Sequence, residues 1–282
     1  MPDIMILTSV KGVSDQAVQA ACAGVNTDAP RRLSANAVEV ALRGARPSVA
    51  LAEVDVNFVP AENRIKKLLI ADMDSTIIPV ECIDELADFA GVKAQISEIT
   101  EIAMRGEMGF EESLTTRVGF LKGLGEDALA RCYEERISLN PGARVMVQAM
   151  NEHGAYTALV SGGFTYFTAK VSVDAGFAHN RANRLELENG VLTGRVTLPI
   201  LGREAKQLEM DELCAARRIS RADVIAVGDG ANDLAMIEAA GLGVAYHAKP
   251  ALKEAADVVL DHSDLSALLA IQGIAEADYS SS

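Results

Sequence analysis

The chain has 282 residues, of which 49% are hydrophobic and 23% charged, so it can bury a sizeable core. Its 40 Asp and Glu residues outnumber its 26 Lys and Arg residues, which gives a formal net charge of −14. This acidity, with no block of basic residues, argues against nucleic acid or an anionic membrane as a partner. An anionic substrate would need a local cation at its binding site, because the overall field repels it.

The sequence shows no signal for export or membrane insertion. The N-terminus lacks a basic n-region, and no apolar stretch approaches the ~18 residues that a membrane helix needs. We expect reduced core thiols at the four widely spaced cysteines, Cys22, Cys82, Cys132 and Cys214. The four histidines are equally scattered, so no zinc-site spacing is present. These features predict a cytoplasmic protein, and they leave the oligomeric state open, a homodimer included.

Residues 1–62 form a predicted small N-terminal α/β unit. The pattern predicts strands over 4–9, 38–42 and 54–59, a helix over 14–23 and a linker over 60–64. Nothing in this unit carries recognisable chemistry.

From residue 63 onward the pattern changes to buried strands separated by helices. Short apolar runs at 67–71, 156–160, 224–227, 242–245 and 258–260 are typical of strands buried on both faces. Asn140 and Pro141 predict the N-cap and first turn of a helix that ends before Gly154. The alternation predicts an α/β domain over 63–282, with a doubly wound, mostly parallel sheet.

Residues 81–139 contain no comparable strand. Amphipathic spacing predicts helices over 83–90, 94–105, 111–122 and 127–138. We therefore expect a helical cap inserted directly after the first core strand. Further along, Asn189-Gly190 predicts a type I′ hairpin turn within residues 185–192.

Two carboxylates stand directly after the first apolar run, in Asp72-Met73-Asp74-Ser75-Thr76. A calcium loop that began at Asp72 would need Gly at the position of Ile77 and Glu at the position of Ile83. The EF-hand alternative therefore fails. Because a buried strand precedes them, we expect both carboxylates at the carboxyl end of a sheet rather than in a surface turn.

Two glycine-containing segments follow other predicted strands. Ser161-Gly162-Gly163 offers a hydroxyl and backbone N–H groups that can approach an anion closely. The segment Gly228-Asp229-Gly230-Ala231-Asn232-Asp233 does not fit the dinucleotide fingerprint, because Asp233 occupies its last glycine position. Its acidity suits a metal ion better than a pyrophosphate. Taken alone, either segment is also compatible with an ordinary turn.

Lys206 lies in an expected helix over 204–217 with several polar residues, so on its own it fits a solvated surface lysine. Other polar residues gather at one rim of the expected sheet: Asp72, Asp74, Ser161, Asp229 and Asp233. In an open α/β sheet, ligands bind outside the carboxyl ends of the strands. Clustered carboxylates need a cation among them, and oxygen ligands beside a phosphate favour Mg²⁺ over zinc.

The ordered set Asp72-x-Asp74-x-Thr76, Ser161, Lys206 and Gly228-Asp229-Gly230-x-x-Asp233 resembles the four signature motifs of the haloacid-dehalogenase-like phosphatases. The resemblance covers about residues 66–282 and includes the position of the helical cap. It implies that Asp72 is a nucleophile that becomes phosphorylated and that Asp74 is the general acid and base. It also implies Mg²⁺ on Asp72, Asp229 and the backbone carbonyl of Asp74, phosphoryl contacts from Ser161, Gly162, Gly163 and Lys206, and support from Thr76 and Asp233.

The cap resembles that of the phosphoserine phosphatases over residues 72–85 and 109–118. The resemblance implies that Glu81 faces the substrate ammonium, Arg117 its carboxylate and Phe110 its apolar side, and that Asn232 contacts substrate near the phosphate. A bidentate Arg suits a carboxylate. Without the resemblance, Glu81 fits a first-turn helix acid and Arg117 a solvated helix residue.

The resemblance therefore implies hydrolysis of O-phospho-L-serine to L-serine and phosphate, the last step of serine biosynthesis. One alternative is a phosphatase or phosphotransferase of the same superfamily that acts on another small phosphomonoester. Another is a non-catalytic amino-acid sensor, against which the intact Asp72 and Asp74 argue. Residues 1–62 resemble a truncated form of the small regulatory modules that phosphoserine phosphatases often carry, so effector binding is not implied.

Overall fold

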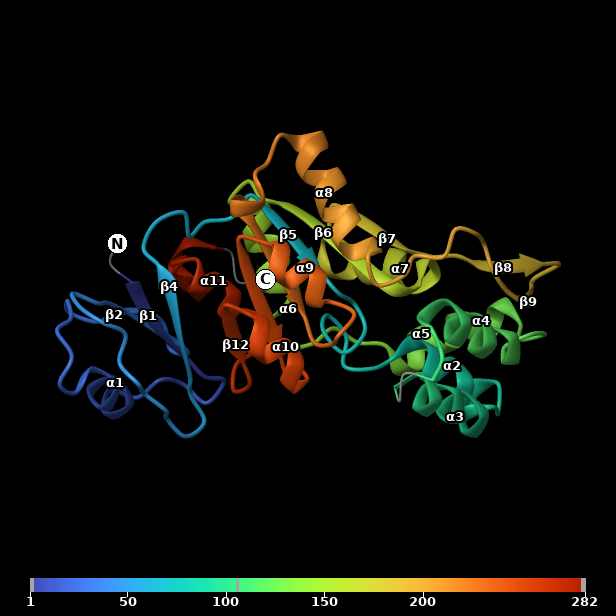
Figure 1. Ribbon diagram of the computed structural model, residues 1–282, viewed down its shortest axis with the longest axis horizontal. Helices are drawn as coiled ribbons and strands as arrows, with labels where there is room; N and C mark the ends of the chain where they lie inside the picture. The colour runs from blue at the N-terminus through green and yellow to red at the C-terminus, as the bar shows by residue number, and fades with distance from the viewer. Residues whose placement is uncertain (1–2, 105–106, 280–282) are drawn as a thin grey trace.

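The computed structural model describes residues 3–104 and 107–279. Its elements form three groups along the long axis of the molecule (Figure 1). A small antiparallel sheet lies at one end, a six-stranded sheet with helices on both faces lies in the middle, and a helical group lies at the other end. Among the described residues, none of the helices combines the length and apolar character needed to cross a bilayer.

The central sheet is parallel throughout and has the doubly wound order that the sequence predicts. From edge to edge it contains β12 (Val258–Leu260), β11 (Leu242–Tyr246), β10 (Val224–Gly228), β5 (Leu68–Ala71), β6 (Tyr156–Phe164) and β7 (His179–Asn183). The chain builds outward from β5 through β6 and β7, then returns to the other side of β5 to build β10, β11 and β12. The strand order therefore reverses between β5 and β10, which is where such sheets bind ligands.

Alternate residues of each strand face the two sides of this sheet, so helices on both sides bury them. Leu69 and Ala71 of β5 join the larger core cluster, which is covered by α6 (Ala143–Glu152), α7 (Thr165–Ala175) and α11 (Ala267–Ile271). Leu68 and Ile70 join a second cluster under α8 (Ala205–Arg217), α9 (Leu234–Ala239) and α10 (Pro250–Ala255). Burial on both faces explains why these strands are continuous apolar runs.

A helical group follows the first core strand, as predicted. It contains α2 (Cys82–Phe89), α3 (Lys93–Met104), α4 (Phe110–Phe120) and α5 (Glu126–Arg136). The hairpin of β8 (Leu185–Glu188) and β9 (Val191–Val196) lies beside α4 (Figure 1). Its turn residues Asn189 and Gly190 have φ values of 51° and 79°, as a type I′ turn requires. The backbone N–H of Gly123 donates to the carbonyl of Leu192 at 2.8 Å and joins the hairpin to the helical group.

Residues 3–60 form an antiparallel sheet in the order β2-β3-β1-β4 with one helix. Its elements are β1 (Asp3–Thr8), α1 (Asp15–Cys22), β2 (Arg31–Ser34), β3 (Ala37–Ala41) and β4 (Asp55–Pro60). The side chain of Asn57 pairs with the edge of the central sheet, donating to the carbonyl of Val259 and accepting from its N–H, both at 2.9 Å. This side chain therefore takes the place of a neighbouring strand at the outer edge of β12.

Three details differ from the sequence prediction. Strands β2 and β7 were not expected, because their polar residues lack a strand pattern. The predicted N-cap at Asn140 is wrong: α6 begins at Ala143, after Gly142 with a φ of 78°. The Asn140 side chain donates instead to the carbonyl of Thr76, at 2.7 Å. The 3₁₀ turns η1 (Arg221–Asp223) and η2 (Glu276–Asp278) complete the described elements.

Candidate active site

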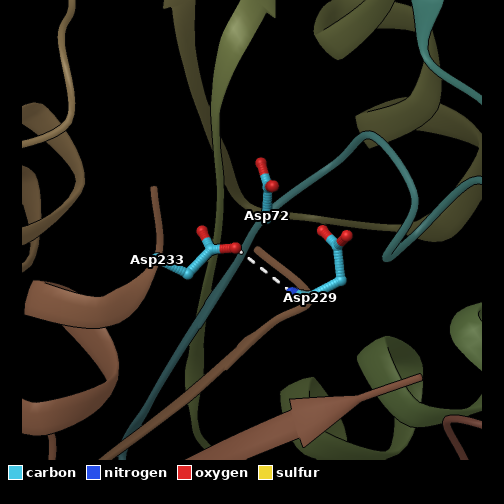
Figure 2. A group of neighbouring side chains, drawn as sticks. All are labelled: Asp72, Asp229 and Asp233. Carbon is cyan, nitrogen blue, oxygen red and sulfur yellow. Dashed lines mark hydrogen bonds between the residues drawn. The ribbon is translucent and has the colours of Figure 1, made fainter. Parts of the chain in front are cut away.

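Three carboxylates converge at the carboxyl ends of β5 and β10. Asp72 follows β5, Asp229 follows β10, and Asp233 precedes the first turn of α9. Figure 2 shows the three side chains grouped together, and one oxygen from each lies within 4.8 Å of the others. The two strands are parallel neighbours, and the N–H of Asp72 donates to the carbonyl of Val227 at 3.0 Å. Strand pairing thus brings together the first and last motifs found in the sequence.

Lys206 is buried within this group and is not the solvated surface lysine that its helix alone suggests. Its ammonium lies 2.7 Å from Asp72 Oδ1 and 2.5 Å from Asp233 Oδ1. Burial acts to lower the pKa of Lys206, but Asp233 and Asp72 outweigh it, so the pKa rises above its ordinary value. Lys206 is therefore charged at neutral pH and supplies the local cation that the acidic chain otherwise lacks.

Asp233 holds the loop that carries Asp229. Besides its contact with Lys206, its second oxygen accepts hydrogen bonds from the N–H groups of Asp229 and Gly230, each at 3.1 Å (Figure 2 shows the first). A Cβ atom at position 228 would lie only 2.4 Å from Asp233 Cγ, so glycine is required there. Because both oxygens of Asp233 are engaged, Asp72 and Asp229 are the carboxylates left to bind a ligand.

Asp72 and Asp229 form a donor set that fits a hard cation. Asp72 Oδ1 accepts from the N–H of Met73 at 2.8 Å, and Asp229 Oδ1 accepts from the Thr76 hydroxyl at 3.3 Å. Among the described residues, no hydrogen bond engages Oδ2 of either carboxylate. Burial raises the pKa of Asp72 well above its usual range, and burial followed by Asp233 raises that of Asp229 to about 6. The raised pKa values mean that ionising these buried carboxylates is unfavourable, and a cation bound to their oxygens would favour the ionised form.

Asp74 lies beside this group and is suited to proton transfer. Its Oδ1 accepts from the N–H of Cys82 at 2.9 Å, and its Oδ2 accepts from the Ser161 hydroxyl at 3.2 Å. Burial, with a smaller contribution from Glu81, raises the pKa of Asp74 to about 7. A carboxyl group with this pKa can donate and recover a proton at neutral pH.

The segment Ser161-Gly162-Gly163 bulges within β6 rather than following its end. Val160 pairs with Arg181 and Phe164 with Asn183, so three residues of β6 lie opposite one residue of β7. The N–H of Gly163 donates to the Ser161 hydroxyl at 2.9 Å. A Cβ at position 163 would lie 2.7 Å from Asp74 Oδ2, so this glycine allows the bulge to approach the acid.

The structure brings one predicted cap residue directly onto this bulge. Phe110 begins α4, and a Cβ at position 162 would lie 3.2 Å from its Cζ atom. The Phe110 ring therefore covers Gly162 and closes one side of the bulge.

Glu81 and Arg117 interact with each other electrostatically. Glu81 is exposed at the N-cap of α2 and accepts from the Ser75 hydroxyl at 2.7 Å. Arg117 is half-buried, and its Nε donates to the carbonyl of Ser113 at 3.3 Å. Burial lowers the pKa of Arg117, whereas Asp84 and Glu81 raise it. In the part of the chain that the structure describes, no carboxylate forms an ion pair with Arg117 within 4.0 Å.

Sequence reasoning missed two asparagines that hold the site. Asn140 binds the carbonyl of Thr76, and Asn183 binds that of Gly162 at 2.8 Å. Asn183 stands in no recognisable motif, and the sequence predicts Asn140 only as a helix N-cap, so the folded chain alone identifies their contacts at the site. Asn232, which was expected to contact substrate, is half-buried in the loop after β10, beside Gly230.

Known proteins resemble this chain in sequence and in fold. Residues 69–238 match the family model of the haloacid dehalogenase-like hydrolases. A phosphoserine phosphatase of Polaromonas is 48% identical over 208 residues, which are 72% of this chain and 88% of that protein. One of Archaeoglobus fulgidus is 46% identical over 209 residues, 74% of this chain but 60% of that protein. A solved phosphoserine phosphatase with a phospho-aspartyl intermediate analogue is 39% identical, with a TM-score of 0.68 over 73% of this chain and 98% of its own.

Proposed function

Because this chain belongs to the haloacid dehalogenase-like hydrolases and, among them, to the phosphoserine phosphatases, we propose that it hydrolyses O-phospho-L-serine to L-serine and phosphate. The observation that carries the proposal is the buried contact between Asp72 and Lys206, with Asp74 alongside. It combines a nucleophile, a cation for the phosphoryl group and a proton donor at one rim of the sheet.

In the first step, Asp72 attacks the phosphorus atom and forms an aspartyl-phosphate. Asp74, whose pKa is raised to about 7, protonates the serine oxygen as its bond to phosphorus breaks. Lys206, the Ser161 hydroxyl and the Gly162 N–H donate hydrogen bonds to the phosphoryl oxygens. Phosphoryl transfer depends chiefly on such positioning and charge neutralisation.

In the second step, Asp74 takes a proton from the attacking water, and phosphate leaves Asp72. We propose that Mg²⁺ is held by Asp72, Asp229 and the backbone carbonyl of Asp74 and supplies further neutralisation of phosphoryl charge when bound. Thr76 supports Asp229 through its hydroxyl, and Asp233 holds the Asp229 loop and Lys206.

For the amino-acid part of the substrate, we propose that Arg117 binds the carboxylate and Glu81 the ammonium. The support for Arg117 is that it is half-buried and forms no ion pair among the described residues. The support for Glu81 is that it is exposed and near enough to Arg117 and Asp74 to act to raise the pKa of both. We assign Phe110 to the apolar wall and Gly163 and Asn232 to contacts near the phosphate.

A phosphate-release assay on phosphoserine, phosphothreonine and sugar phosphates, with and without Mg²⁺, tests the proposal. We expect the highest kcat/KM with phosphoserine and activity that requires Mg²⁺. A preference for another phosphomonoester, or transfer of phosphate to an added alcohol, would favour the alternative substrate or acceptor. The absence of turnover on every ester would favour an amino-acid sensor.

The division of the chain is also a proposal. We assign residues 1–62 to the N-terminal unit and 63–282 to the phosphatase domain, with the cap at about 81–139. A cytoplasmic location and the absence of nucleic-acid partners stay predictions from the sequence. Light scattering on the purified protein would test the homodimer.

A further inference from the structure

The bulge in β6 leaves the carbonyl of Gly162 outside the strand pairing, and the side chain of Asn183 binds it. Because three residues of β6 lie opposite one residue of β7, the strand pairing is interrupted between Val160 and Phe164. The carbonyl of Gly162 accepts a hydrogen bond from the side chain of Asn183, at 2.8 Å. Asn183 is the last residue of β7 and is only 2% exposed. The carbonyl of Gly162 is partly buried and has lost its place in the strand pairing, so the Asn183 side chain supplies its hydrogen-bond partner.

The same side chain also holds the segment that leads to Lys206. Asn183 Oδ1 accepts from the N–H of Leu201 at 2.7 Å, and its Nδ2 also contacts the carbonyl of Leu201 at 3.4 Å. Leu201 lies between β9 and α8, and Lys206 is the second residue of α8. Both polar atoms of Asn183 are therefore used, one group binding the bulge and the other the approach to α8.

A second contact holds α8 against β7 without touching the bulge. Glu209 is buried and contacts His179 at 2.8 Å and also the guanidinium of Arg181. This group places the helix, whereas Asn183 alone among these residues joins the helix approach to Gly162. The two contacts therefore have separable roles.

We propose that Asn183 is a positioning residue that fixes the Gly162 N–H relative to the Lys206 ammonium. The inference rests on the proposed function, in which both groups contact the phosphoryl oxygens. The peptide that follows the Gly162 carbonyl carries the N–H of Gly163, so the bond from Asn183 also restrains the contact of Gly163 with Ser161. Preorganised donors act on the charge of the transferring group, and small displacements weaken them strongly.

Asn183→Ala removes every bond of this side chain, and Asn183→Asp keeps a similar volume and an acceptor for Leu201 but loses the donor to Gly162. Asn151→Ala is the matched control. Its side chain also ties a turn, donating to the carbonyl of Gly176 at 2.8 Å and accepting from Thr157 at 3.0 Å, but at the amino end of β6. All variants are compared by thermal unfolding, by kcat and KM, and by inhibition with inorganic phosphate.

We expect both Asn183 variants to lose on the order of tenfold to a hundredfold in kcat, with inorganic phosphate inhibiting about tenfold more weakly. The ratio of kcat/KM for phosphoserine to that for an ester without a carboxylate should stay constant, because Arg117, the proposed carboxylate-binding residue, is unchanged. Asn151→Ala should lower the unfolding temperature and leave kcat and phosphate inhibition as in the wild type.

The proposal is wrong if either folded Asn183 variant retains wild-type kcat and phosphate inhibition, or if its losses equal those of Asn151→Ala. Should Asn183→Ala not fold, Asn183→Asp decides by the same criteria. The kinetic comparison uses any phosphomonoester that the wild type hydrolyses. It therefore still tests the role of Asn183 if phosphoserine is not the substrate. If the wild type hydrolyses none, the proposed function fails, and calorimetric titration with inorganic phosphate still compares the variants.

Discussion

The ammonium of Lys206 lies 2.7 Å from Asp72 Oδ1, and each of these two side chains is only 4% exposed. A buried charge pair of this kind is costly to form, so its presence beside further carboxylates indicates a role other than stability. The pair places a fixed positive charge next to the nucleophile. In a chain with a net charge of −14, the ammonium of Lys206 offers a positive group to the phosphoryl oxygens at this place.

Replacing Lys206 should harm both stability and chemistry. Lys206→Met leaves Asp72 and Asp233 buried without their cation, and breaking a buried pair in this way costs about 3–5 kcal/mol. Loss of a donor to the phosphoryl group should lower kcat by about 10²–10³. Urea unfolding and phosphate release measure the two effects. Lys67→Met is the control, since its pair with Asp223 is exposed and contributes at most about 1 kcal/mol. Equal losses in the two variants would contradict the assignment of Lys206.

The stability of the metal-free protein should fall as the pH rises from 5 to 8. Burial raises the pKa of Asp74 to about 7 and that of Asp229 to about 6, whereas unfolded carboxyl groups titrate near ~4. Between these values the folded state binds more protons than the unfolded state, so raising the pH favours unfolding. The urea midpoint in the presence of a chelator measures this effect.

Two comparisons make the pH experiment specific. Asp74→Asn should reduce the pH dependence, because an amide does not titrate. Added Mg²⁺ should restore stability most at pH 8, where the carboxylates are ionised and can bind it. A metal-free protein that becomes more stable between pH 5 and 8 would contradict the raised pKa values.

Gly163→Ala should impair catalysis more than folding. The added Cβ would lie 2.7 Å from Asp74 Oδ2 and would displace the proposed acid or the bulge itself. We expect kcat to fall by at least about tenfold, since misplacement by ~1 Å costs about 10² in rate. Gly119→Ala in α4 is the control, because its Cβ meets no atom within 4 Å and alanine favours a helix. Wild-type kcat in Gly163→Ala would show that the close approach has no catalytic role.

The N-terminal unit should unfold together with the rest of the chain. Asp55 is buried and accepts hydrogen bonds from the N–H of Asp261 at 2.9 Å, the N–H of His262 at 3.0 Å and the Ser263 hydroxyl at 2.6 Å. Asp55→Ala leaves these donors without their acceptor and should cost about 3 kcal/mol. The variant should keep wild-type kcat at a temperature at which it is folded.

Asp15→Ala is the control for Asp55, because the Asp15 side chain is 90% exposed. Denaturant unfolding followed by circular dichroism should show one transition in the wild type and an earlier one in Asp55→Ala. Separate transitions for the N-terminal unit and the remainder in the wild type would contradict close coupling between them.

Much of this fold could be predicted because its core strands are buried on both faces and are therefore apolar runs. The β5 strand is an example, with Asp72 directly after it. Edge strands such as β7 could not be found in this way, since His179-Asn180-Arg181 gives no apolar pattern. The wrong helix start at Asn140 has a tertiary cause: the side chain that would cap the helix binds the carbonyl of Thr76 instead.

The motifs predicted which functional groups lie at the rim of the sheet, but not which of them contact one another. Spacing does not indicate that Lys206 is buried, because its contacts with Asp72 and Asp233 exist only after α8 packs on the sheet. Nor does it show that Asp233 uses both oxygens within the protein. Asn183 has no sequence signal at all, since its partners lie 21 and 18 residues away.

In the cap assignment, the guanidinium of Arg117 binds the carboxylate of the substrate and not a carboxylate of the protein. Arg117→Ala should lower kcat/KM for phosphoserine by about 10² or more while changing hydrolysis of an ester without a carboxylate only slightly. Arg131→Ala, at a 60% exposed side chain of α5, should leave both unchanged. Equal effects of Arg117→Ala on the two esters would remove Arg117 from the carboxylate site.

Covalent catalysis by Asp72 is the central claim, and Asp72→Asn tests it most directly. The substitution keeps the size of the side chain and removes the nucleophilic oxygen. In a Mg²⁺-containing phosphate-release assay, with folding confirmed by circular dichroism, we predict at least a ~10³-fold loss of kcat. Mass spectrometry of quenched protein should find a phosphorylated Asp72 in the wild type and none in the variant. Full Mg²⁺-dependent turnover by Asp72→Asn would contradict the account.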